Sequence, residues 1–218
     1  FIDLRPLIKL DSMKATMKTL SAILICCFIS TIQMYGENIQ RPESENYVKG
    51  VEALNEGNPE AAYTYLNAEI NEHPDNGYAH CYMALICNFC NDTKLALQAL
   101  NSSLELIPEA DTEYRSFAHY SRGVLLSNLK MWERAEADLN EAIRLNPEDV
   151  ENYKSRAQLY FETERYEESL DDLTRALKLD SKADVNDLML QLMAVAPTSE
   201  FMERITATYQ QLDQVTIH

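Results

Sequence analysis

Small residues and leucines recur along most of this chain in a fixed order. A small residue is followed twelve positions later by a second small residue, and four positions after that by a leucine. Residues four apart lie on one face of an α-helix, so the second small residue and the leucine predict a buried helical stripe. The first small residues are Gly50, Ala84, Gly123 and Ala157, the second are Ala62, Ala96, Ala135 and Ser169, and the leucines are Leu66, Leu100, Leu139 and Leu173.

Each occurrence of this pattern predicts a pair of antiparallel helices of about 14 residues each. The two small positions fall on different helices, and two helix backbones approach closely only where the side chains are small. Pro74, Pro108 and Pro147 end the first three units, because proline does not continue a helix interior. The polar residues 91–93 predict the start of the second helix of the second unit.

The repeat length is 34 residues, except that five extra residues, 111–115, precede the third unit. In helical conformation they lengthen the first helix of that unit by about 7 to 8 Å. Asp111 or Thr112 is predicted to cap this helix, because either side chain accepts a hydrogen bond from a backbone amide at a helix start. The four units are therefore predicted at residues 43–76, 77–110, 116–149 and 150–183.

The period, the residue columns and segments such as AEADLNEAIRLNPED and YEESLDDLTRALKLD resemble the tetratricopeptide repeat family over residues 43–183. The resemblance implies an all-α fold, a right-handed superhelical solenoid of antiparallel helix pairs whose neighbours bury a continuous core. Three positions depart from the family pattern. Arg156 stands where the family usually has a large apolar residue, and Glu69 and Ser103 stand where it favours alanine.

Residues 184–218 do not follow the columns, but they contain two amphipathic stretches, 185–196 and 199–215, separated by Pro197. These stretches are predicted to form a degenerate helix pair that caps the repeats, since a terminal repeat needs a more polar outer face. The alternative is that further repeats or another domain follow.

The start of the chain has the layout of a secretory signal. Lys14 and Lys18 precede an uncharged, largely apolar run over residues 19–36, and this order is typical of export signals. We interpret residues 1–36 as upstream residues plus a signal peptide, and residues 37–42 as a short linker. The chain is thus expected to be exported to the periplasm of a bacterium or outside the cell.

Cys26 and Cys27 within this run raise the alternative of a lipid anchor. Lipoprotein signals place a small residue just before the cysteine, whereas Leu24 and Ile25 precede these two. Cleavage near residue 37 without lipid attachment is therefore favoured. Contact with a membrane is expected only through the signal.

Composition and charge narrow the classes of partner. The chain is 46% hydrophobic and 25% charged, which suits a soluble protein with a sizeable core, and its formal net charge is −16. Nucleic acids and anionic lipid surfaces attract basic proteins, so neither is predicted as a partner. The acidic exterior is interpreted as a solvated surface, and an acidic face for a basic partner is the alternative.

The sequence contains no phosphate loop, nucleophile elbow or zinc-binding helix motif. Cys87 and Cys90 have the spacing of a redox pair, but they fall at a helix end with no strand before them, so we interpret them as packed side chains. His80 and His119 occupy the same repeat column, which favours a packing role over a metal site. The chain is predicted to be a non-enzyme without a metal or cofactor.

The first helix of each unit carries a second stripe, at offsets of three and four residues, outside the small and leucine columns. In the family that the chain resembles, this face lines a concave groove that holds partner peptides. Some members clamp a partner's carboxylate with recurring Lys, Asn and Arg, of which only Lys154 is present, so an aromatic, apolar groove is expected. Packing between repeats is the alternative. The candidate groove residues are Tyr47, Tyr78, Leu85, Phe117, Tyr120, Val124, Lys154 and Gln158.

Together these patterns predict an exported scaffold or adaptor that binds a segment of another protein in the groove. In one alternative, the repeats are the N-terminal part of a longer, catalytic envelope protein, or Cys87 and Cys90 take part in thiol exchange. In another, the chain self-assembles into a homo-oligomer, with the groove filled by the C-terminal helix of a second copy.

Overall fold

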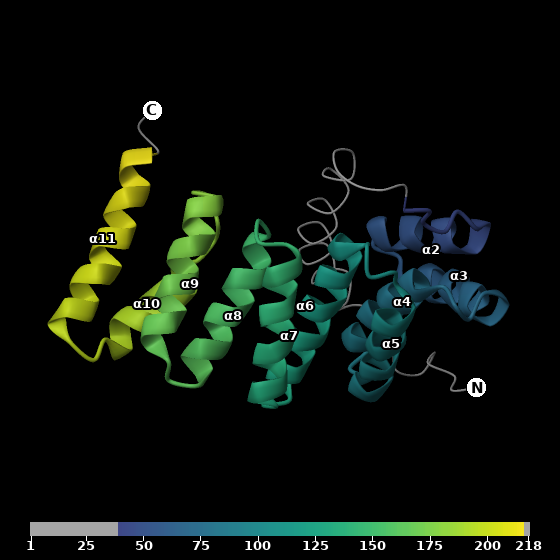
Figure 1. Cartoon of the computed structure of the whole chain (residues 1–218), viewed down its shortest axis with the longest axis horizontal. Coiled ribbons are helices and arrows are strands. Elements are labelled where there is room, and N and C mark those ends of the chain that lie inside the picture. Colours follow the sequence, from purple (N-terminus) through teal and green to yellow (C-terminus); the bar gives the residue numbers. More distant parts are fainter. Residues whose placement is uncertain (1–38, 216–218) are drawn as a thin grey trace. The chain divides into compact units, whose positions relative to one another are not determined.

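Among residues 39–215, which a computed structural model of the chain describes, ten α-helices and no strands occur (Figure 1). The all-α fold class predicted from the repeat is confirmed. The helices are α2 (Glu45–Asn55), α3 (Pro59–Glu72), α4 (Gly77–Phe89), α5 (Thr93–Leu106), α6 (Thr112–Asn128), α7 (Trp132–Leu145), α8 (Val150–Glu162), α9 (Tyr166–Leu179), α10 (Asn186–Val195) and α11 (Ser199–Val215).

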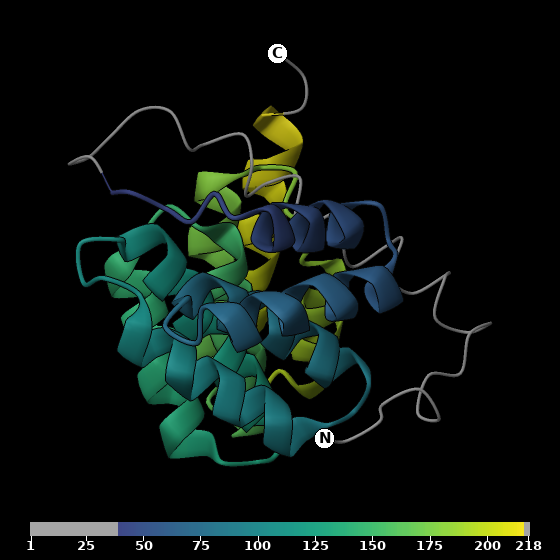
Figure 2. The same ribbon diagram turned by 90° about the vertical axis from the view of Figure 1, so that its right-hand side faces the viewer.

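The chain divides into two compact units, each larger than a single repeat. The first unit ends at Tyr114 and the second begins at Arg115, so the division falls inside α6. In the first unit α2 packs against α3, α3 against α4, and α4 against α5. Figure 2 shows α2 and α3 lying side by side. In the second unit α8 packs against both α7 and α9, and α9 contacts α10 and α11. Helices that follow one another in the sequence are thus packing neighbours within each unit.

The repeat columns form the core. The four leucines of the leucine column are at most 2% exposed. A Cβ atom added to Gly50 would lie 2.7 Å from Cγ of Leu66, and one added to Gly123 would lie 2.9 Å from Cγ of Leu139. The first small residue of a repeat therefore packs directly on the leucine of the partner helix, and the prediction that these columns are buried is confirmed.

Several helices begin at a side chain that accepts a backbone N–H. Asn76 and Asp92 accept hydrogen bonds from the amides three residues further on, at 3.1 and 3.0 Å. Oδ1 of Asp111 accepts the N–H of Tyr114 at 3.3 Å, at the start of α6. The cap predicted for this helix is therefore confirmed, and Asp111 supplies it. With the inserted residues, α6 has 17 residues against 13 in α4.

A residue with positive φ separates the two helices of each repeat. Gly57, Asn91, Lys130 and Glu164 have φ angles of 71°, 59°, 58° and 61°, and they occupy one column of the repeat. A residue in this left-handed conformation often ends a helix, and glycine and asparagine adopt it at least cost. At Lys130 and Glu164 the turn is kept despite residue types that disfavour it, so the neighbouring helices determine its geometry.

Glu69, one of the departures from the family pattern, is fully buried. Its Oε1 accepts a hydrogen bond from Nδ2 of Asn76 at 2.7 Å, while Oδ1 of Asn76 caps α4. This bond satisfies one oxygen of the buried carboxylate, whereas Oε2 of Glu69 is buried without a hydrogen-bond partner among the described residues. Glu69 thus stands in place of a small apolar residue because it orients the cap of the following helix.

Residues 184–218, predicted as a capping helix pair, include the two helices α10 and α11. Phe201 and Ile205 of α11 are at most 1% exposed and belong to one apolar cluster with Leu188 and Leu192 of α10 and Leu173 of α9. The boundaries of the predicted domains, including the capping role of this pair, stay predictions.

The predicted signal, with Cys26 and Cys27, lies outside the described residues. Within residues 39–215, no helix combines the length and the apolar character needed to cross a membrane.

Candidate partner-binding surface

The first-helix face of the first unit is a cluster of buried tyrosines. Tyr47, Tyr78, Tyr82 and Tyr114 are 5 to 7% exposed. Tyr78 meets Tyr114 edge to face with ring centroids 4.8 Å apart, and the hydroxyls of Tyr82 and Tyr114 are 3.1 Å apart. The structure therefore places two predicted groove residues, Tyr47 and Tyr78, in a packed cluster, whereas Leu85 is half-buried.

Arg41, from the segment before α2, lies on this cluster. Its guanidinium carbon is 4.5 Å from the centroid of the Tyr114 ring. Its Nε and Nη2 each donate a hydrogen bond of 3.0 Å to Asp111, and Nη2 also donates one of 2.8 Å to Glu113. The hydroxyl of Tyr78 donates to the same Asp111 carboxylate at 3.0 Å. Burial and the neighbouring Asp111 charge raise the pKa of Tyr78 above its ordinary value.

The first-helix face of the second unit is more open. Phe117, Tyr120 and Val124 of α6 are half-buried, and the rings of Phe117 and Tyr120 are stacked with an interplanar angle of 23°. On α8 the Lys154 side chain is 25% exposed, and Gln158 is exposed. Burial raises the pKa of Tyr120 to about 12, so this hydroxyl stays protonated at neutral pH.

A hollow of about 180 Å³ lies next to the last two of these residues. Its apolar side chains come from α9, α10 and the residue before α10, and its polar side chains come from α8, α10 and the segment before α10. Residues of α8 and α10 therefore line a hollow that is open to solvent. Its lining residues are Lys154, Gln158, Leu173, Asp184, Val185, Asp187, Leu188 and Gln191.

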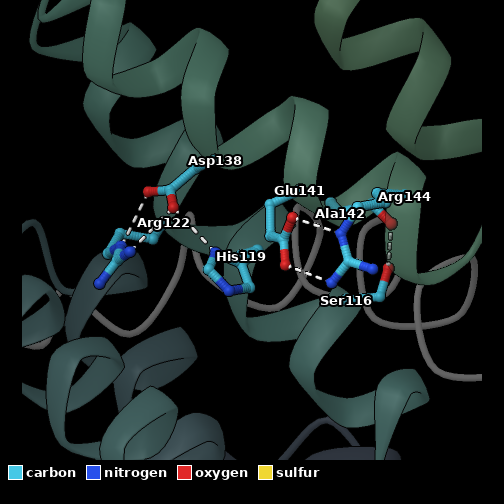
Figure 3. Close-up of polar contacts among 7 residues, drawn as sticks. All are labelled: Ser116, His119, Arg122, Asp138, Glu141, Ala142 and Arg144. Atoms are coloured by element: carbon cyan, nitrogen blue, oxygen red, sulfur yellow. Dashed lines mark hydrogen bonds and ion pairs between the residues drawn. The ribbon is translucent and has the colours of Figure 1, made fainter. Parts of the chain in front are cut away.

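Two arginine–aspartate pairs, each with a buried aspartate and a half-buried arginine, join the helices of the third and fourth repeats and were not anticipated from the sequence. Arg122 of α6 donates two hydrogen bonds of 2.8 Å to Asp138 of α7, and Nδ1 of His119 lies 2.9 Å from the same carboxylate (Figure 3). Arg156 of α8 makes the same fork to Asp172 of α9, with two bonds of 2.7 Å. The departure of Arg156 from the family pattern is thereby explained.

These pairs occupy one position of the repeat, because both members shift by 34 residues from the third repeat to the fourth. The second repeat has Met83 and Ala99 there. The first has Lys49 and Tyr65, whose ammonium and ring centroid are 5.7 Å apart. The recurring Arg and Asp, sixteen residues apart, were the sequence signal that would have revealed the pairs.

The two aspartates differ in pKa. Burial alone would raise the pKa of Asp138, but the hydrogen bonds and charges of Arg122 and His119 outweigh it and lower that pKa. Burial dominates at Asp172 and raises its pKa despite Arg156. Asp138 therefore stabilises the fold above about pH 4 and loses this effect as the pH falls, whereas ionisation of Asp172 reduces stability as the pH rises through its pKa.

The other candidate chemical groups are packed. Cys81 and Cys87 are buried, and burial raises the pKa of both thiols to about 12, which keeps them protonated and poorly reactive at neutral pH. Cys90 is half-buried with a raised pKa, and all three thiols are free. Nε2 of His80 lies 2.9 Å from the Pro74 carbonyl oxygen. In the described part of the chain, no three His, Cys, Asp or Glu side chains are placed to hold a metal ion.

Part of this chain, with its repeated helix pairs, is similar in sequence to a known family. Two adjacent segments, residues 116–149 and 151–182, match the profile described as Tetratricopeptide repeat. Residues 116–182 therefore contain two tetratricopeptide repeats. The two matched repeats are those that carry the arginine–aspartate pairs.

Two curated relatives agree with this tetratricopeptide repeat assignment. The Lipoprotein NlpI homolog of Haemophilus influenzae is 31% identical over 87 residues, which is 40% of this chain and 28% of that protein. Tetratricopeptide repeat protein 6 of Homo sapiens is 24% identical over 143 residues, which is 66% of this chain and 26% of that protein. The chain thus spans little more than a quarter of the length of either relative.

Solved structures share the tetratricopeptide fold. MamA from Desulfovibrio magneticus RS-1 aligns with a TM-score of 0.62 and 19% identity, covering 78% of this chain and 94% of that one. YrrB, described as a TPR protein with an unusual peptide-binding site, aligns with a TM-score of 0.53 and 21% identity, covering 63% and 68%. These likenesses confirm the predicted fold class, the helical solenoid of tetratricopeptide repeats.

Proposed function

We propose that this tetratricopeptide repeat protein is a scaffold that binds a segment of a partner protein on the first-helix face of its second unit. The observation that carries the proposal is the hollow beside Lys154 and Gln158, two residues that the stripe on the first helices had already singled out. Phe117 and Tyr120, two half-buried residues on α6, add aromatic groups to this proposed surface. Partly exposed aromatic side chains are the groups that contribute most at protein interfaces.

The size and lining of the hollow favour a protein segment as the ligand. Its volume of about 180 Å³ is well below the roughly 300 to 1,000 Å³ typical of small-molecule sites. Leu173, Val185 and Leu188 supply apolar surface. Lys154 supplies one positive charge, and Asp184 and Asp187 supply two negative charges. Such a site suits one apolar side chain of a segment whose flanking groups are polar. The peptide-binding site in the description of YrrB supports the same class of ligand.

The scaffold proposal includes the absence of catalysis. Tetratricopeptide repeats act by holding other proteins, and the thiols, which were the candidates for chemistry, have raised pKa values. A longer protein that contains this chain as its repeat region would carry its catalytic groups elsewhere.

The substitution Tyr120→Ala is expected to weaken partner binding by on the order of 1 to 4 kcal/mol, because it removes a rigid aromatic contact. The partner would be captured from the envelope fraction of the native host, identified, purified and titrated by calorimetry. Tyr65→Ala is the matched control, since Tyr65 is also half-buried but lies on α3, a second helix of the first unit. It should bind with unchanged affinity.

Three results would contradict this site. Equal losses of affinity in the two variants would mean that the first-helix face of α6 has no special role. Normal binding by Tyr120→Ala together with early melting would mean that the aromatic stripe serves packing between repeats. A complex formed only between copies of the chain would point instead to self-assembly.

We also propose that the protein is exported, to the periplasm if the host is a bacterium. The lysines and apolar run of residues 14–36 support this, as does the similarity to a protein described as a lipoprotein. Terminal sequencing of protein made in its native host should find a start near residue 37. An uncleaved start on cytosolic protein would disprove export.

A further inference from the structure

Residues 39–44 lie on the first-helix face of the first unit without forming a helix of their own. Arg41 connects this segment to the start of α6, 70 residues further along the chain. Gln40 and Glu43 on either side are exposed. Among the described residues, Arg41 makes the side-chain hydrogen bonds that join this segment to the helices. The segment is thus held on this face by one anchoring side chain.

The surroundings of the Arg41 guanidinium match its chemistry on three sides. The Asp111 carboxylate, 1% exposed, accepts from both Nε and Nη2 in a parallel fork, which is a geometry that lysine cannot provide. Glu113 adds a second carboxylate, at 2.8 Å from Nη2. The face of Tyr114 lies under the guanidinium at 4.5 Å, within the range of a cation–π contact. The Tyr78 hydroxyl fixes the orientation of the Asp111 carboxylate.

The residues that build this site come from the insertion at 111–115, which interrupts the 34-residue period. The insertion supplies Asp111, Glu113 and Tyr114 together, in a stretch that the packing of regular repeats does not need. Asp111 is costly to bury without a cation, because its carboxylate loses hydration, whereas Glu113 is 27% exposed. Besides capping α6 through Asp111, the insertion thus supplies the groups that contact the Arg41 guanidinium.

We propose that the first unit carries a binding site for an arginine side chain of an extended partner segment, and that Arg41 occupies this site as an internal competitor. The proposal concerns the first unit and does not depend on the partner surface of the second. A tethered ligand of this kind acts at an effective concentration on the order of millimolar. A partner segment binds when residues 39–44 are displaced. The tyrosine cluster that contains Tyr47 and Tyr78 then becomes the surface that the partner contacts.

The test vacates the site and offers it the same side chain in a separate molecule. The probe is a fluorescein-labelled peptide with the sequence of residues 39–46, Ile-Gln-Arg-Pro-Glu-Ser-Glu-Asn, and its binding is followed by fluorescence anisotropy. We expect the Arg41→Ala protein to bind this peptide at least about tenfold more tightly than the unchanged protein, which is blocked by its own arginine. The same peptide with lysine in place of arginine should bind at least about tenfold more weakly to the variant.

A second substitution separates recognition from folding. In Arg41→Ala/Asp111→Asn the carboxylate is lost, but asparagine still caps α6 because it is as good a cap residue as aspartate. Peptide binding should disappear while the helical circular dichroism is retained. If Arg41→Ala alone proves poorly folded, peptide added to it should raise its melting temperature, because a ligand of the native state stabilises that state. Arg41→Lys would then replace it in the anisotropy assay.

Two outcomes would overturn the proposal. A folded Arg41→Ala protein that binds no peptide would show that Arg41 only fastens the segment before α2 to α6. Equal binding of the arginine and lysine peptides would show that the site attracts positive charge without recognising a guanidinium group.

Discussion

Replacement of Leu139 by alanine is expected to lower the free energy of unfolding by about 2 to 5 kcal/mol, the range for large-to-small changes in a packed core. Leu139 is completely buried. Its Cγ packs so closely on Gly123 that even one added carbon there would lie 2.9 Å away. A cavity at this seam between α6 and α7 does not close easily, because both backbones are already in contact. Urea denaturation followed by circular dichroism measures the change.

Leu129→Ala is the control for this prediction. Leu129 is 43% exposed at the end of the same helix pair, and its truncation should change the free energy of unfolding by no more than about 0.5 kcal/mol. In linked repeats the loss at Leu139 should also speed amide hydrogen exchange in α8, which packs on α7. Equal melting of both variants would mean that the leucine column has been placed wrongly.

The single substitution Arg122→Met should destabilise the protein by about 2 to 4 kcal/mol, because it leaves the buried Asp138 carboxylate without its strongest partner. The cost stays below that of an entirely unpaired charge, since His119 remains 2.9 Å from Asp138. Thermal and urea unfolding of the variant at pH 7 provide the measurement.

The double substitution Arg122→Met/Asp138→Ala should recover to within about 1 kcal/mol of the unchanged protein, since buried ion pairs are often replaceable by apolar residues. The chain itself supplies the precedent, because the second repeat has Met83 and Ala99 at these positions. Arg144→Met is the control for loss of an arginine. Arg144 pairs with Glu141 but is 67% exposed, so its loss should cost less than about 1 kcal/mol. A double variant as unstable as the single one would refute this account.

The sequence predicted the repeats, the buried columns and a helix cap at Asp111 or Thr112, because each of these depends on a local or periodic pattern. Its stripe of candidate groove residues divides in the structure. Tyr47 and Tyr78 are buried, whereas Tyr120 and Lys154 remain partly exposed. In the first unit Tyr78 bonds to Asp111, which in turn pairs with Arg41, 70 residues away in the sequence. No periodic pattern reports a contact of that kind.

The arginine–aspartate pairs were missed for another reason. Arg156 was recognised as a departure from an apolar position, but charged residues are common on exposed helix faces of so acidic a chain. Its meaning depends on a second departure, Asp172, on the partner helix. Comparing the two helices of each repeat in the same register would have brought the two residues together.

The alternation between an apolar pair in the second repeat and ionic pairs in the third and fourth bears on how the chain avoids errors as it folds. Repeats with similar sequences invite a helix to pair with the wrong neighbour. If α6 took the place of α4 beside α5, Arg122 would face Ala99 and be desolvated without a carboxylate. If α4 took the place of α6, Met83 would leave Asp138 without its arginine. Either exchange incurs the penalty of an unpaired buried charge. The pairs therefore disfavour wrong pairing of helices during folding, even though they add little to the stability of the native protein.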